Sequence, residues 1–144
     1  MTATWKWYGT GVRHLMQGDI NFASGTYKIL LTTSTYVPNQ DTHEYRSSIT
    51  NEVSPSGTYV AGGVTVAGMA VTYDAASNQA RVVWNDSVIT NCTITCRTSV
   101  LYKSVGTAAT DILIAYATEA SDIVATNGSL TLDQPVPCLY ITAL

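Results

Sequence analysis

The sequence has few charged residues. Only 12% of its 144 residues are Asp, Glu, Lys or Arg, about half of the ~25% that is usual for a soluble domain. Thr, Ser, Asn and Gly replace the missing charge, so the expected surface is polar but weakly self-repelling. Two interpretations stay open: a protein that lies packed against neighbours, or a composition that many β-proteins share.

A basic stripe is also missing. The seven Lys and Arg residues are scattered and the net charge is −3, so a nucleic-acid backbone would find little to neutralise. No run of ~18 apolar residues is present, and this predicts that no segment spans a membrane. The first residues, MTATWKWYGTG, lack the apolar core of a signal peptide. We therefore expect synthesis in the cytosol without export by the usual route, and no nucleic-acid or membrane partner.

Cysteine and histidine do not occur at the spacing of a metal site. Cys92 and Cys96 are four residues apart in an alternating segment, which places them ~13 Å apart if that segment is a strand. A disulfide needs Cα atoms within about 7 Å, so these two cannot pair there. Either could meet Cys138, but buried free thiols are favoured. Neither His14 nor His43 completes a zinc site, and no metal or cofactor is expected.

Residues that could perform catalysis do not form a motif. The sequence has no G-x-S-x-G elbow. His14 is expected to cap or pack near the N-terminus, and His43 to lie on a loop surface. Turn and cap roles explain nearly all of the carboxylates. We expect no enzymatic activity.

Alternation with period two dominates the rest of the chain. In residues 26–33, Tyr27, Ile29 and Leu31 share one face, which predicts a strand with one buried face. In residues 88–102 the even positions, from Val88 to Tyr102, are expected on one face. Fifteen residues exceed a usual strand, so we expect a bulge or bend within this segment.

Turn signals separate the other strands. Residues 74–78 form a polar connection between strands at 71–73 and 80–84, and Asn127-Gly128 predicts a hairpin turn between residues 123–124 and 130–132. Pro135 and Pro137 confine the last segment, residues 138–144, to a sheet edge. The pattern predicts an all-β chain, an antiparallel β-sandwich of jelly-roll or immunoglobulin-like type, with one domain over residues 1–144.

Two segments fall outside this pattern. Residues 1–17 are expected to form an extended N-terminal arm, which either docks on a neighbour or folds back onto the core. Residues 34–58 are expected to form a long loop, in which Asp41 or Thr42 caps a short helical turn carrying Glu44 to Arg46. Aromatic residues suit protein interfaces, although those of the loop could instead anchor it to its own sheet. The candidate interaction residues are Trp5, Trp7, Tyr36, Pro38, Asn39, Tyr45 and Tyr59.

Two segments of the sequence support a family resemblance. Residues 26–53 read TYKILLTTSTYVPNQDTHEYRSSITNEV, and residues 56–84 read SGTYVAGGVTVAGMAVTYDAASNQARVVW. Both resemble small virion structural proteins of tailed bacteriophages, over approximately residues 18–118. Residues 134–138 depart from the family's usual ending.

This resemblance implies a non-enzymatic capsid decoration, or cement, protein. Such a subunit binds the outer surface of the major capsid protein lattice, often as a trimer, and would be made in the cytoplasm of the host bacterium. The 34–58 loop and the Trp5-Trp7 arm are the expected contacts. Alternatives are a tail-tip, fibre or head–tail joining component, or a carbohydrate-binding module. Trp84, beside Asn85 and Asp86, is the one candidate for a sugar platform, although a core position is favoured for it.

Overall fold

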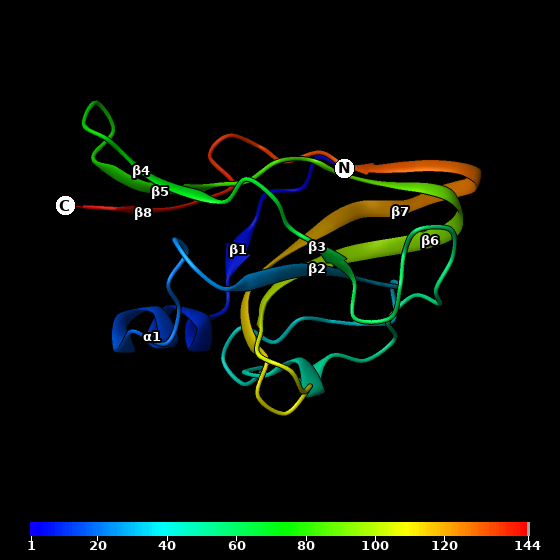
Figure 1. The fold of residues 1–144 in the computed structure, drawn as a ribbon, viewed down its shortest axis with the longest axis horizontal. Helices are drawn as coiled ribbons and strands as arrows, with labels where there is room; N and C mark the ends of the chain where they lie inside the picture. Colours follow the sequence, from blue (N-terminus) through cyan, green and yellow to red (C-terminus); the bar gives the residue numbers. More distant parts are fainter. Residues whose placement is uncertain (144) are drawn as a thin grey trace.

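The computed structural model describes residues 1–143, and antiparallel strands make up most of it (Figure 1). One sheet has the order β1-β7-β6-β2-β3 and the other the order β4-β5-β8. The predicted all-β, sandwich-like fold is therefore confirmed. In chain order the elements are β1 (Lys6–Trp7), α1 (Gly9–Gln17), β2 (Thr26–Thr32), the 3-10 helix η1 (Arg46–Ser48), β3 (Val64–Thr65), β4 (Ala70–Asp74), β5 (Gln79–Val83), β6 (Ser87–Ser104), β7 (Ile112–Leu132) and β8 (Leu139–Thr142).

A single long hairpin organises both layers. Its strands β6 and β7 have 18 and 21 residues and pair along nearly their whole length. Figure 1 shows the hairpin curving back at the right of the view, so that the start of β6 and the end of β7 lie above the five-stranded sheet. The predicted strand at residues 88–102 and the predicted irregularity within it are both confirmed.

The irregularities change which residues of β6 face the core. Ile89 points into the main apolar cluster, then Cys92, Ile94 and Cys96 do, and then Leu101. The pairing register shifts between residues 89 and 92 and again between 96 and 98. Each inserted residue exchanges the inner and outer faces of a strand. The prediction that all even positions share one face is therefore wrong. Cys92, Ile94 and Cys96 face the main apolar cluster, whereas Val100 and Tyr102 face the opposite side of the sheet.

The first bend contains two asparagines with left-handed backbone. Asn91 has φ 52° and Asn127 has φ 47°, a conformation that asparagine tolerates better than most residues. The Asn127 N–H donates to Thr93 Oγ1 at 3.0 Å, which links the two strands at the bend. The predicted hairpin turn at Asn127-Gly128 is wrong, because this dipeptide lies inside β7. A residue with positive φ can occupy an irregular site within a strand as well as a turn, and Asn127 does the former.

Apolar contacts cover both faces of the five-stranded sheet. On one face Ile29, Leu101 and Ile114 belong to a cluster that also contains Val82 and Trp84 of the other layer. The opposite face has a second cluster, formed by Tyr8, Leu30, Tyr36, Val100, Tyr102 and Leu113. Burial of one face only, as predicted for residues 26–33, is therefore wrong, since Leu30 is only 1% exposed.

The N-terminal segment is not an extended arm. Residues 6–7 pair with β7 as β1, and α1 follows at once. Gly11 allows the helix to approach β7, because a Cβ at this position would lie 2.7 Å from the Leu113 carbonyl oxygen. Gly18, at φ 88°, ends the helix, and the Asp19 N–H donates to the His14 carbonyl at 2.9 Å. Of the two alternatives for this segment, the structure contains the second, in which it folds back onto the core.

The long loop contains its helical turn, but later than predicted. The turn is η1, at Arg46–Ser48, preceded by Tyr45. Asp41 and Thr42 do not cap it. Their N–H groups instead donate to the Asn39 side chain at 3.0 and 3.1 Å.

Several other predictions are confirmed. Strands β4 and β5 pair around residues 74–78, and β8, which follows the two prolines, is an edge strand. Cys92, Cys96 and Cys138 are buried and free. The last residue of the predicted domain, Leu144, lies outside the described residues.

Substitution of two glycines that share a backbone conformation tests how closely the chain before β3 approaches β2. Gly63 has φ +87°, and a Cβ there would lie 2.1 Å from the Ile29 carbonyl oxygen, whereas Gly18 has φ +88° with open space around it. We predict that Gly18→Ala lowers the free energy of unfolding by ~1–2 kcal/mol through backbone strain. Gly63→Ala should cost a further ~1–3 kcal/mol from overpacking. Urea unfolding measures both, and equal losses would contradict the close approach.

Candidate interaction surface

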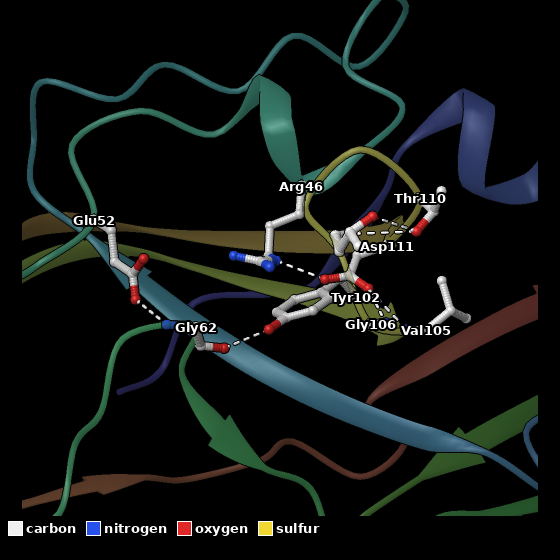
Figure 2. A network of polar contacts seen from close by, with 9 residues as sticks. Arg46, Glu52, Gly62, Tyr102, Val105, Gly106, Thr110 and Asp111 are labelled. Carbon is white, nitrogen blue, oxygen red and sulfur yellow. Dashed lines mark hydrogen bonds and ion pairs between the residues drawn. The ribbon is translucent and has the colours of Figure 1, made fainter.

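Buried polar groups fix the long loop to the sheet. Arg46 Nε donates to Asp111 Oδ2 at 2.7 Å, and the other Asp111 oxygen accepts from the Val105 and Gly106 N–H groups at 2.7 and 3.1 Å. The Arg46 guanidinium also lies over the Tyr102 ring, 5.4 Å from its centre. Figure 2 shows these groups converging on Asp111, whose side chain is 1% exposed. The connection between β6 and β7 is thereby tied to η1.

A second set of bonds holds the other end of the loop. The Tyr102 hydroxyl donates to the Gly62 carbonyl, and the Gly62 N–H donates to Glu52 Oε1 at 2.7 Å (Figure 2). Tyr59 donates to the same Glu52 oxygen at 3.0 Å and accepts the Leu31 N–H of β2 at 3.0 Å. The loop is thus a fixed cover over the sheet.

The charge of Asp111 is stabilised inside this network. Burial by itself raises the pKa of the Asp111 carboxyl, but the Val105 N–H, Arg46 and the Gly106 N–H outweigh it. Together they hold the pKa below its usual range. The network is therefore strongest where Asp111 is ionised.

Three of the aromatic residues predicted at an interface are buried in the chain itself. Trp5 is 7% exposed, Tyr36 4% and Tyr59 1%. The Tyr36 hydroxyl lies 2.8 Å from that of Tyr8 and 2.9 Å from His43 Nδ1. The alternative in which loop aromatics anchor the loop to its own sheet is what the structure contains for Tyr36 and Tyr59.

The other predicted interaction residues keep some exposure. Asn39 is exposed, and Trp7, Pro38 and Tyr45 are half-buried. Trp7 Nε1 donates to the Tyr140 carbonyl at 3.1 Å. Val37, beside Pro38, is 76% exposed, so residues 37–39 form an accessible tip on the long loop.

The three-stranded sheet, β4-β5-β8, projects from the body, and we call it the wing (Figure 1). The cross-strand pairs Val71–Val82, Tyr73–Ala80 and Ala80–Ile141 place these residues on one face. Val71, Tyr73 and Ile141 are 56%, 61% and 44% exposed. Val82, on the same face, is buried in the main apolar cluster, so the wing presents an apolar face that its own chain covers only in part.

An apolar groove runs beneath this face. It has a volume of about 450 Å³ and lies between the wing and the segment from α1 to Phe22. Its lining includes Leu15, Ile20, Phe22, Val71, Val82 and Ile141. Alternation at residues 71–73 and 80–84 was visible in the sequence. The pairing of β8 with β5 completes the face. It joins residues about 60 positions apart, so no local sequence pattern predicted it.

Other candidate chemistry finds no support in the described geometry. Trp84 is 5% exposed and packs edge-on against Trp5, with ring centres 5.5 Å apart, so it offers no sugar platform. Within residues 1–143, no group of three or more His, Cys, Asp or Glu side chains is arranged to hold a metal ion. The only α-helix of that range, α1, is too short to cross a membrane. His14 packs at the N-terminal segment as expected, and His43 is half-buried rather than on the surface.

Comparisons with known proteins returned no relative: no protein-family model, curated protein or solved structure matches this chain.

Asp111 allows the polar network to be tested by pH. We predict that Asp111→Asn lowers the free energy of unfolding at pH 7 by roughly 1.5–3 kcal/mol, the value of hydrogen bonds to a charged group. Because the folded-state pKa of Asp111 is depressed, its contribution is full above about pH 5 and is lost as pH falls below about 4. Urea unfolding between pH 7 and 3 should show wild type and variant converging in acid. Asp41→Asn, at an exposed position of the same loop, is the control, and a pH-independent difference for Asp111→Asn would contradict the assignment.

Proposed function

We propose that this protein is a non-enzymatic structural component of a tailed-bacteriophage virion. The role we assign is capsid decoration, in which the subunit binds the outer surface of the major capsid lattice and stabilises the head. Two things support the proposal: the resemblance carried by residues 26–84, and the exposed apolar face of the wing.

The wing face is the observation on which the proposal depends. An apolar patch that is uncovered in a folded subunit marks a site of protein contact. Val71 and Tyr73 stand on a projecting hairpin, and a groove of about 450 Å³ continues their surface toward α1. Leaving such side chains in water forgoes roughly 25 cal/mol for each Å² that a partner would cover.

We assign this face to contact between copies of this chain. In a closed ring of three copies the same residues of each copy approach one another around the three-fold axis, so any charge on them would be repelled. The face carries no Asp, Glu, Lys or Arg, since Asp74 and Arg81 lie on the opposite face and pair there at 2.6 Å. The resemblance implies a trimer, and a closed ring of three copies would cover each exposed face.

Contact with the capsid lattice is assigned to the loop tip at residues 37–39. Val37 is the most exposed apolar residue of the long loop, and the Arg46–Asp111 network holds the loop in one conformation. A fixed tip loses little conformational entropy on binding. A standard interface buries ~1,600 Å², and several joined copies on one lattice add avidity to individually modest contacts.

The wing assignment predicts the oligomeric state. Val71→Asp, which puts a like charge into each copy-to-copy contact, should convert the oligomer to a monomer with an unchanged fold. Val88→Asp is the matched control, because Val88 is also a strand residue, 54% exposed, and lies away from the wing. Analytical ultracentrifugation measures both. A monomeric wild type, or equal effects of the two variants, would contradict the assignment.

The lattice assignment predicts binding to heads that lack this protein. Wild type should saturate such heads and raise their disruption temperature, and Val37→Asp should lower occupancy at least tenfold without changing the oligomeric state. Removal of residues 2–11 would not be informative, because Trp5 and Tyr8 belong to the core. Cryo-microscopy of whole particles separates the alternatives, since density at a tail tip, fibre or head–tail joint would replace the decoration role. Binding on a glycan array without binding to heads would favour the carbohydrate-binding module.

A further inference from the structure

The wing has an open edge at β4. The sheet order places β4 and β8 at its two edges (Figure 1). The chain covers part of the β8 edge, because Trp7 Nε1 donates to the Tyr140 carbonyl at 3.1 Å. Within residues 1–143 no strand pairs with the outer side of β4, and its first four residues are exposed. The backbone of β4 is therefore accessible to another strand.

The other sheet edges have features that hinder strand addition, and β4 has none of them. Strands β1 and β3, at the edges of the five-stranded sheet, have two residues each, and Pro135 and Pro137 precede β8. Short edge strands, proline, lysine and bulges are the usual means by which proteins prevent edge-to-edge pairing. Strand β4 has five residues, reads AVTYD, and pairs with β5 without a register shift. Such an edge is a template for a further strand.

The hydrogen bonds of the wing show which groups of β4 point outward. The Ala143 N–H donates to the Asn78 carbonyl at 2.7 Å, so the Asn78 carbonyl points toward β8. Backbone direction alternates along an antiparallel strand. The odd-numbered residues of β5 therefore bond to β4, and Thr72 is opposite one of them. Val71 and Tyr73, on either side of Thr72, consequently direct their N–H and C=O groups away from β5.

We propose that the β4 edges of two copies pair antiparallel across a two-fold axis at Thr72. In this register Val71 of each copy lies opposite Tyr73 of the other, and the outward N–H and C=O groups of both residues are bonded. No other antiparallel register gives both residues a partner within β4. The edge is thus complementary to a second copy of itself.

The side chains fit the same register. Val71 and Tyr73 form aromatic–β-branched pairs on the apolar face, and the two Thr72 side chains meet on the other face. Both are favourable cross-strand pairs. Asp74 lies opposite Ala70, so the pairing opposes no like charges. The occupant that the edge fits is therefore another copy of this chain.

This contact adds to the one proposed for the wing face. It joins two three-stranded wings into one continuous sheet with both apolar faces on the same side. It uses the backbone of β4, whereas the contact assigned to the face uses side chains, so the two can coexist. The pairing rests on the geometry of β4 and not on a role in a virion.

A cysteine at the two-fold axis tests the register. Opposed residues of a non-hydrogen-bonded antiparallel pair have Cα atoms about 4.5 Å apart, within the range of a disulfide. Thr72→Cys should therefore give a disulfide-linked dimer on mild oxidation. Ala70→Cys is the matched control, because it lies on the same face but is offset by ~13 Å along the strand from its counterpart. It should cross-link at least tenfold more slowly, and the native cysteines are buried.

Equal cross-linking rates, or the absence of a Thr72→Cys dimer, would overturn the pairing. An absent cross-link in a protein that still sediments as an oligomer and binds heads would overturn the edge contact alone and leave the proposed function standing.

Amide hydrogen exchange tests the same contact in the wild-type protein. The Val71 and Tyr73 N–H groups should exchange at least tenfold more slowly in concentrated protein than after dilution to the monomer. The Thr72 N–H, which bonds to β5, is the internal control and should not change. Fast exchange of Val71 and Tyr73 at both concentrations would overturn the pairing. Protection that arises only on phage heads would also overturn it, since a strand of the capsid protein would then occupy the edge.

Discussion

The fold depends on bending a hairpin that is longer than the domain. At ~3.3 Å per residue, the 18 residues of β6 would extend roughly 60 Å, whereas a compact chain of this length measures roughly 40 Å across. Two of the four register shifts between β6 and β7, at residues 89–92 and 96–98, resolve this mismatch. They turn the hairpin back over the sheet, and each exchanges the faces of the strand, so that Ile89, Cys92 and Leu101 all point into one core.

A second consequence of the bend is that the opposite face of the sheet also needs a cover. The long loop supplies it, with Tyr36 packed beside Tyr8 and Leu30. Arg46, Asp111 and Glu52 bind this irregular backbone to the sheet, since no strand ladder is available to satisfy its polar groups. The loop is therefore as much a structural layer as a candidate contact, and its tip at residues 37–39 is one of its exposed parts.

The sequence predicts well what is decided locally. Alternation identified β2 and β6, and turn residues identified the β4–β5 hairpin. It failed where distant residues decide the outcome. Helix α1 is short and contains two glycines, and its close packing on β7 depends on Gly11, which no local pattern indicates. Asn127-Gly128 lies within a strand instead of a turn, with Gly128 opposite Cys92 and the Asn127 N–H bonded to Thr93. Tyr36 and Tyr59 appeared exposed because nothing local shows that a loop covers the sheet. The wing face was incomplete in the sequence because β8 comes from the far end of the chain.

The placement of the first residues has a consequence for biosynthesis. Strand β1 pairs with Ala115 and Tyr116, Trp5 donates to the Gln134 side chain at 2.9 Å, and Trp7 donates to the Tyr140 carbonyl. These partners leave the ribosome more than 100 residues later, on the order of 10 s at ~5–20 residues per second. Until then both indole N–H groups lack their native acceptors, although Phe22 and Trp84, which pack edge-on against Trp7 and Trp5, are synthesised earlier.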